Sequence, residues 1–265
     1  MAEIIKFPES DSVYTRRLVE IASEAQAEVA SLYDEGAPQP LAYHNSRHTG
    51  FVMAAGRLLA DAAGLDVYDT ALVTAAAAAH DIVQLAPRGE MEKRSAEWLA
   101  TRIDAAELGP EESCIAYQAV RGTEPLYNID GFITVQRVVY QEYPSERGQT
   151  IAQIVACADM AELYQPSGPL HSLDLYKETQ QGIQPGQEPV FDQKELLVFQ
   201  LSKRALLESY QYPHDVGERL LTGLREKVIE HEVIISQDIA LERISSWQEL
   251  VERNQQFAAR YAEDV

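Results

Sequence analysis

Apolar residues recur at the spacing of an α-helix along nearly all of this 265-residue chain, and almost no segment alternates with the period of two typical of a β-strand. Pro, Gly and polar capping residues separate the periodic segments. The pattern therefore predicts an all-α protein. The expected helices run over Ser12 to Leu32, Ser46 to Ala63, Val67 to Val83, Glu90 to Ile103, Pro110 to Val120, Ser145 to Leu163, Leu173 to Gly182, Gln193 to Tyr210, Asp215 to His231 and Gln237 to Ala262.

Two regions interrupt this pattern. Residues 126–144 (LYNIDGFITVQRVVYQEYP) are rich in β-branched side chains and fit either a short strand or a buried helix. A Pro/Gly break at residues 165–172 (QPSGPLHS) predicts a helical core over residues 1–165 and a C-terminal helical extension over residues 166–265. The amphipathic helices of the extension either complete the same bundle or form the surface of a homodimer.

Charge narrows the classes of partner. The formal net charge is −20, which argues against binding to extended nucleic acid or to an anionic membrane surface. A small anionic ligand would need local positive charge from Arg side chains or a metal ion. The chain shows neither a signal-peptide pattern nor a long uncharged apolar run, so we expect a cytoplasmic protein. Cys114 and Cys157 are far apart in the sequence, and we expect both to be buried structural cysteines.

The first misplaced polar residue is His48. Asn45 or Ser46 is a good N-cap, so a helix should begin there with His44 in the preceding turn. An apolar stripe follows His48 at helical spacing and directs it into the core; its members are Phe51, Val52, Ala55, Leu58 and Leu59. A core histidine satisfied by one hydrogen bond would explain His48 alone.

The second is the pair His80-Asp81, which ends a run of apolar residues that includes five consecutive alanines. Two polar groups at the end of such a run are unfavourable unless both have partners. A second copy of the dipeptide, His214-Asp215, follows a proline and opens a helix, where Asp215 fits a solvated N-cap. The dipeptide alone is therefore weak support for a functional site, and its apolar setting distinguishes the first copy.

The third is Asp159, which shares one helical face with Ile151, Ile154, Val155 and Ala158. A buried carboxylate needs a cation nearby, and no basic residue lies within one turn on that face. A distant Arg or Lys, or a metal ion, would serve.

Convergence of these residues would explain all three anomalies together. His48, His80, Asp81 and Asp159 supply two imidazoles and two carboxylates, a nitrogen and oxygen set that suits one divalent ion such as Mn, Fe, Co, Mg or Zn. Adjacent residues on a helix project about 100° apart, so His80 and Asp81 can share an ion only at an edge or near the end of their helix.

The order of these residues resembles that of the HD-domain superfamily of metal-dependent phosphohydrolases. YHNSRH at residues 43–48 is similar to the YHNxxH motif of HD-type phosphohydrolases and cyclic-nucleotide phosphodiesterases. AAAAAHDIV at residues 75–83, followed by MEKRSAEWLA at residues 91–100, is similar to the HDIV…NEERSA run of HD phosphohydrolases. The resemblance covers roughly residues 15–165. It implies a helical bundle of the HD type with a metal ion at its centre. It also implies that the protein hydrolyses a small phosphorylated substrate such as a nucleotide.

The resemblance also implies roles for individual residues. His48, His80, Asp81 and Asp159 would be the metal ligands, His44 would be the general acid, and Glu92 would bond a ligand or a water. An exposed loop histidine and an exposed first-turn acid are the alternatives for His44 and Glu92. Candidate phosphate-binding cations are Arg47, Arg88, Lys93, Arg94 and Arg121, although most could be ordinary surface charges.

Departures from the family pattern favour a single metal ion. No further histidine follows His80 within residues 81–93, and Gln84 and Leu85 stand where guanosine-polyphosphate hydrolases carry an acidic pair. His171 and His231 lack metal-ligand spacing, which is typical of surface or hydrogen-bonded histidines. A different class of function stays open as well, namely a non-catalytic HD-fold signalling or interaction module, which the acidic surface and the additional C-terminal helices would suit.

Overall fold

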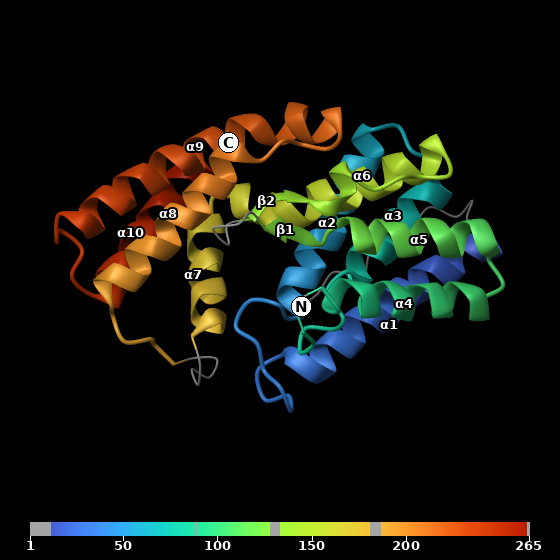
Figure 1. Ribbon diagram of the computed structural model, residues 1–265, viewed down its shortest axis with the longest axis horizontal. Helices are drawn as coiled ribbons and strands as arrows, with labels where there is room; N and C mark the ends of the chain where they lie inside the picture. Colours follow the sequence, from blue (N-terminus) through green and yellow to red (C-terminus); the bar gives the residue numbers. More distant parts are fainter. Residues whose placement is uncertain (1–11, 88, 128–132, 181–186, 264–265) are drawn as a thin grey trace.

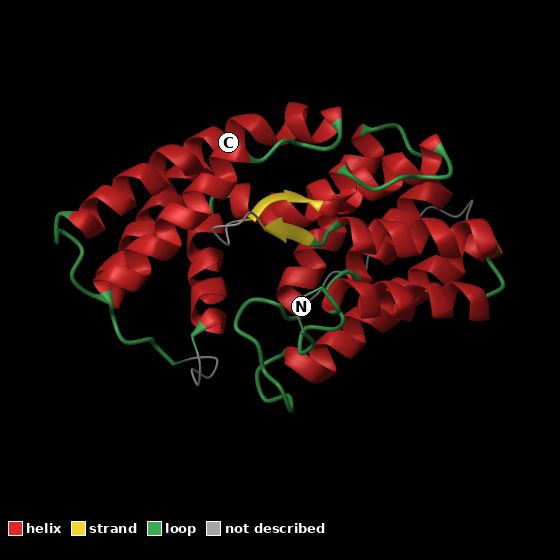
Figure 2. Cartoon of the chain, in the orientation of Figure 1, coloured by secondary structure: helices red, strands yellow, loops and turns green. Residues whose placement is uncertain are grey.

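The computed structural model describes residues 12–87, 89–127, 133–180 and 187–263 (Figure 1). Within these ranges lie ten α-helices, two short strands and two 3-10 helices, which confirms the all-α prediction (Figure 2). The N-terminal part contains α1 (Val13–Tyr33), α2 (Ser46–Ala62), α3 (Val67–Ala79), α4 (Met91–Ala105), α5 (Pro110–Gly122), β1 (Pro125–Tyr127), β2 (Ile133–Gln136), η1 (Arg137–Val139), α6 (Glu146–Ala161) and η2 (Glu162–Tyr164). The C-terminal part contains α7 (Gly168–Thr179), α8 (Gln193–Ser209), α9 (Asp215–Ala240) and α10 (Trp247–Glu263).

Helix α3 lies at the centre of the N-terminal bundle. Its five consecutive alanines are fully buried, and α1, α2, α5 and α6 pack around it. Small side chains let these helices approach closely. Gly56 of α2 shows how close, because a Cβ there would lie 3.2 Å from Cγ1 of Val73 on α3. The alanine run therefore places the end of α3, with His80 and Asp81, inside the bundle.

The C-terminal helices build a second apolar core. It is formed by Leu173, Tyr176, Leu196, Ile235, Ile239, Ile244, Trp247 and Leu250. Helix α9 belongs to both cores, because Val216 and Val228 in its first part join the N-terminal core while Ile235 joins the second. Figure 1 shows α8, α9 and α10 gathered on one side and α1 to α5 on the other, with β1 and β2 between them. The division at residue 165 stays a prediction, since the N-terminal core takes side chains from beyond it.

Residues 126–144 were expected to form either a short strand or a buried helix, and the described part contains strands. Within the described part of this stretch, β1 and β2 pair antiparallel, with Leu126 opposite Val135, and η1 follows directly. The hairpin brings Gln136 toward the N-terminal bundle, where it contacts α6.

The boundary between α9 and α10 differs from the expectation. Helix α9 continues through the predicted break at residues 232–236 and ends at Ala240. Glu242 then adopts a left-handed conformation with φ of 57°, and the amide of Arg243 donates to the carbonyl of Asp238 at 2.8 Å. Glycine usually occupies the left-handed position that follows a helix, so the sequence lacked the glycine that would have marked the end of α9. Helix α7 also begins earlier than expected, at Gly168 with Pro169 in its first turn.

Three local expectations are corrected, two by the exposure of a side chain and one by a capping hydrogen bond. Leu58, expected in the core stripe of α2, has 66% of its surface exposed, while Val52 and Leu59 are buried. Cys114 is exposed, whereas Cys157 is buried as expected. His214 rather than Asp215 caps α9, because Nδ1 of His214 accepts from the amide of Val216. Within the described residues, no helix combines the length and apolar character needed to cross a membrane.

Candidate metal centre

The segment before α2 is held in place by polar contacts. Asn45 is the N-cap, and its side chain accepts from the amides of Arg47 and His48. Asp34 fixes the start of the helix by accepting from the amide of Ser46 at 2.8 Å and from its hydroxyl at 2.6 Å. This segment therefore presents His44 and His48 from a well-defined turn, as the capping pattern predicted.

His48 is buried and its ring is oriented by a carboxylate. Nδ1 lies 2.6 Å from Oε2 of Glu162, a fully buried residue that follows α6. Burial opposes ionisation of Glu162, but hydrogen bonds from His171 and His48 outweigh it and lower the pKa of the carboxyl group. Oε1 of Glu162 lies 2.7 Å from Nδ1 of His171. His171 is thus a partner of Glu162 rather than a free surface histidine.

His80 lies immediately after the last residue of α3, at the helix end where the geometry of adjacent ligands requires it. Nδ1 lies 2.8 Å from the carbonyl oxygen of Ala77. Because a carbonyl oxygen only accepts, Nδ1 carries hydrogen, and a neutral ring therefore has its lone pair on Nε2. The ring thus presents Nε2 to the interior of the bundle.

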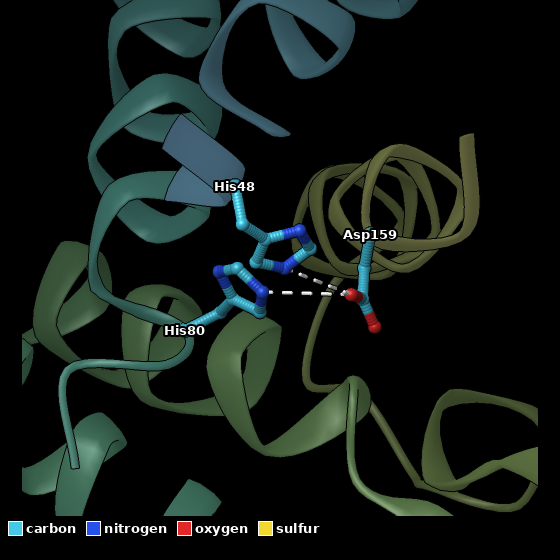
Figure 3. A group of neighbouring side chains, drawn as sticks. All are labelled: His48, His80 and Asp159. Atoms are coloured by element: carbon cyan, nitrogen blue, oxygen red, sulfur yellow. Dashed lines mark ion pairs between the residues drawn. The ribbon is translucent and has the colours of Figure 1, made fainter. Parts of the chain in front are cut away.

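Asp159 on α6 completes the group that Figure 3 shows, in which the two imidazoles point toward its carboxylate from different elements. Oδ1 of Asp159 lies 3.5 Å from Nε2 of His80 and 4.0 Å from Nε2 of His48. One ligand atom from each of the three residues lies within 4.8 Å of the others. Among the described residues, neither Nε2 atom has a partner with hydrogen-bond geometry, although both are buried.

Asp81 lies beside this group as well. Its Oδ2 is 2.9 Å from Nε2 of His80 and 3.3 Å from Nε2 of His48. Burial opposes ionisation of Asp81, yet the nearby His80 and His44 hold the pKa of its carboxyl group well below the usual value. The structure therefore brings all four sequence-predicted ligands together, His48, His80, Asp81 and Asp159.

The donor set fits a divalent metal ion. The Nδ1 atoms of two imidazoles are fixed by partners, while their Nε2 atoms face two carboxylates and have no partner with hydrogen-bond geometry among the described residues. This is the arrangement expected of ligands that point to a common ion. The bond from His48 to Glu162 matches the usual carboxylate support of a histidine ligand. In the absence of a cation, burial opposes a charged His80, but Asp81 and Asp159 raise the pKa of His80 well above its ordinary value. A metal ion would compete with that proton.

His44 stands at the edge of the group. Its Nδ1 bonds a carboxylate oxygen of Glu178 on α7, and its Nε2 lies 3.8 Å from Oδ2 of Asp81. Burial favours the neutral ring, but Glu178 and Asp81 outweigh it and raise the pKa of His44 to about 9. His44 is therefore held in place beside the candidate ligands and is not an exposed loop histidine.

A cavity of about 240 Å³ opens beside these residues. His44, Asp81, Glu92 and Asp159 are among the residues that line it. Glu92 is buried with one carboxylate oxygen lacking a hydrogen-bond partner among the described residues, and burial raises the pKa of its carboxyl group. Glu92 thus belongs to the site's surroundings and is not the exposed first-turn acid that was its alternative.

The C-terminal part of the chain supplies residues that sequence reasoning missed. The hydroxyl of Tyr210, after α8, donates to Oε1 of Gln136 at 2.7 Å, and Nε2 of Gln136 donates to Oδ2 of Asp159 at 2.8 Å. Glu178 on α7 also accepts from the amides of Tyr43 and His44. Tyr210 and Glu178 belong to the predicted C-terminal extension, so this extension helps to position the site.

Four of the five predicted phosphate-binding cations lie in ion pairs. Arg47 pairs with Glu162 at 3.1 Å, and Arg121 pairs with Glu124 at 2.8 Å. Lys93 and Arg94 both lie near Glu90 at the start of α4. Arg88 lies outside the described residues. Among the described residues that line the cavity there is neither Lys nor Arg.

Comparison of the chain with protein-family models, with curated proteins and with solved structures yields no match. The resemblance to HD phosphohydrolases therefore stays a prediction that rests on the motif residues of this chain.

Proposed function

We propose that this chain is a cytoplasmic metal-dependent phosphohydrolase of the HD type, which hydrolyses a phosphoester of a small molecule. The observation that carries the proposal is the state of two buried histidines. Nδ1 of His48 and Nδ1 of His80 each have a partner, while both Nε2 atoms lie near the carboxylate of Asp81 without hydrogen-bond geometry to any described residue. A buried nitrogen without a partner is unfavourable, and coordination of an ion by Nε2 relieves it.

The proposed ligands of the ion are His48, His80, Asp81 and Asp159. A divalent ion held there would neutralise charge on the phosphoryl oxygens and lower the pKa of a coordinated water. Asp81 and Asp159 both line the cavity, so an ion held by them would attract the phosphoryl group of a substrate to this part of the cavity. Glu162 keeps the ring of His48 in its orientation during turnover.

His44 is the proposed general acid. Glu178 holds its Nδ1, so its Nε2 is the atom directed toward Asp81 and the cavity. In hydrolysis the bond between water oxygen and phosphorus forms, the bond to the leaving oxygen breaks, and His44 donates its proton to that oxygen. Glu178 favours the charged form of the ring, so the neutral ring left after the transfer would take up the proton that the attacking water loses.

The test is phosphate release from an aryl phosphate by protein reconstituted with Mn²⁺, Fe²⁺, Co²⁺, Mg²⁺ or Zn²⁺ in turn. Asp81→Asn keeps the shape of the side chain but removes its charge, and we expect kcat/KM to fall by at least about 100-fold because ligand charge and geometry are both affected. Asp215→Asn, in the exposed copy of the dipeptide, should leave kcat/KM unchanged. Equal turnover in Asp81→Asn, or full turnover after removal of metal, would contradict the proposal.

A further inference from the structure

The side chains that line the cavity beside the candidate metal centre fall into two groups. His44, Asp81 and Asp159 form an acidic end, because His44 lies near Asp81 and both carboxylates lie near His80. Most of the remaining lining is apolar and comes from six elements; its residues include Met91, Val135, Met160, Leu163, Leu175 and Leu206. The phosphoryl group of a substrate belongs at the acidic end with the ion, so the apolar lining is left for the rest of the molecule.

The described lining of the cavity offers no positive charge to a second anionic group, because it contains neither Lys nor Arg. Two of the predicted phosphate-binding cations are already paired, because Arg121 contacts Glu124 at 2.8 Å and Arg47 contacts both Glu162 and Asp174. Sites for polyphosphates depend on Arg and Lys contacts or on several ions, since each additional phosphate must exchange water for a cation.

The charge balance of the acidic end leads to the same conclusion. Asp81 and Asp159 together offset the charge of one divalent ion, so the ion leaves little positive charge for groups beyond the first phosphate. Glu92 lines the cavity with a buried carboxylate oxygen that lacks a hydrogen-bond partner among the described residues. A second anionic group on a substrate would therefore meet carboxylates, apolar side chains or neutral polar groups, and no cation among the described lining residues.

We infer that the substrate of the proposed phosphohydrolase carries one phosphoryl group on an uncharged, mainly apolar body, rather than a polyphosphate or a second anionic group. This inference rests on the proposed function for the position of the phosphoryl group. The volume of about 240 Å³ lies below the range of ~300–1,000 Å³ that is usual for small-molecule pockets, so the body is small. A single alkyl chain or aromatic ring is the expected size class.

A pair of non-hydrolysable ligands tests the inference without relying on turnover. Para-methylphenylphosphonate and para-carboxyphenylphosphonate share one body and differ in the second charge. Isothermal titration calorimetry on the full chain loaded with Mn²⁺ should give a Kd at least about tenfold lower for the methyl compound, because the carboxylate finds no cation. Equal or tighter binding of the carboxylate compound would overturn the inference, and so would failure of the methyl compound to bind.

Two variants locate the effect in the cavity wall. Leu175→Lys places a cation on the half-buried lining of α7, and we expect it to reduce the preference for the methyl compound by at least about threefold. Leu201→Lys, on the exposed face of α8, is the matched control and should leave the preference unchanged. An unchanged preference in Leu175→Lys would place the binding elsewhere and overturn the inference.

Hydrolysis is measured separately on para-methylphenyl phosphate. Selective binding of the methyl phosphonate without release of phosphate from this ester would contradict the proposed function and support the inferred ligand class, one phosphoryl group on an apolar body. Hydrolysis that favours nucleoside polyphosphates over this ester would contradict the inferred ligand class and support the proposed function.

Discussion

The dipeptide His-Asp occurs twice in this chain, and the two copies lie in opposite surroundings. His80 is 1% exposed at the end of a buried alanine helix, with Nδ1 bound to a carbonyl and Nε2 facing carboxylates. His214 caps α9, and the side chain of Asp215 beside it is 74% exposed. The same two residues thus form a candidate metal site in one place and a helix cap in the other. The two copies differ in their surroundings and not in residue type, because Nε2 of His80 is buried without a hydrogen-bond partner among the described residues.

A buried polar cluster in the C-terminal core extends the comparison. Nζ of Lys203 lies 2.8 Å from Oε1 of Glu232 and donates to the hydroxyl of Ser172 at 2.7 Å. This cluster contains its own cation, so its carboxylate needs no metal ion. The carboxylates around His80 have no Lys or Arg among the cavity-lining residues described, which is why they suit a metal.

The largest effect that we expect follows from breaking the Lys203 pair. Lys203→Met leaves the carboxylate of Glu232 buried without a cation, and we expect unfolding free energy to fall by ~3–5 kcal/mol in urea titration. Metal content of the folded protein should not change. The double variant Lys203→Met, Glu232→Leu is the control, and we expect it to recover most of the loss. A double variant as unstable as the single one would show that charge burial is not the cause.

The second-largest effect that we expect concerns Glu162, whose carboxylate holds the ring of His48 in place. Glu162→Gln keeps the size of the side chain but weakens its bond to Nδ1 of His48, and we expect metal affinity to fall by about 10- to 100-fold, or ~1.4–2.7 kcal/mol. Competition with a fluorescent chelator measures this. Glu208→Gln on the surface of α8 should bind metal like the unmodified chain. Undiminished affinity in Glu162→Gln would mean that His48 does not depend on this carboxylate.

The smallest effect concerns His231, a buried histidine whose Nε2 does have a partner. It lies 2.8 Å from Oδ1 of Asn254, and its ring stacks on Phe257. Burial lowers the pKa of His231 below its ordinary 6.5, although the bond to Asn254 opposes this. The unfolded chain therefore binds the proton more readily, so stability should rise with pH between the lowered value and about 6.5.

His231→Gln keeps an N–H donor for Asn254 but does not titrate. We expect the slope of stability against pH between 5 and 7 to be shallower in this variant, as measured by denaturant titration at each pH. An identical slope in both proteins would show that His231 does not contribute to it.

Much of the fold could be predicted from local sequence, because caps and apolar stripes are local signals. Asn45 caps α2 where the capping pattern placed it, and α6 begins within one residue of its predicted start, with Ser145 as its N-cap. The end of α9 was missed because Glu242 takes the left-handed position that glycine usually fills. The start of α10 did carry a signal, since Ser246 and Glu249 have the spacing of a capping box and the amide of Glu249 donates to the hydroxyl of Ser246.

The candidate ligands could be predicted because each is a polar residue on an apolar face. Their supporting residues could not, because Gln136, Glu178 and Tyr210 come from segments whose approach depends on the tertiary fold. Glu162 is the exception. It lies three residues after Asp159, which places it on the same helical face. The apolar pattern that identified Asp159 as a misplaced carboxylate therefore identifies Glu162 as well.

The central claim is that His80 binds a metal ion and His214 does not, and elemental analysis of the full chain tests it most directly. The unmodified protein, His80→Asn and His214→Asn are loaded with the same ion and desalted. Asn is itself a good helix cap, so His214→Asn should fold normally. We predict about one equivalent of divalent metal in the unmodified protein and in His214→Asn, and loss of that metal in His80→Asn. Full metal content in His80→Asn, or none in the unmodified protein, would contradict the account.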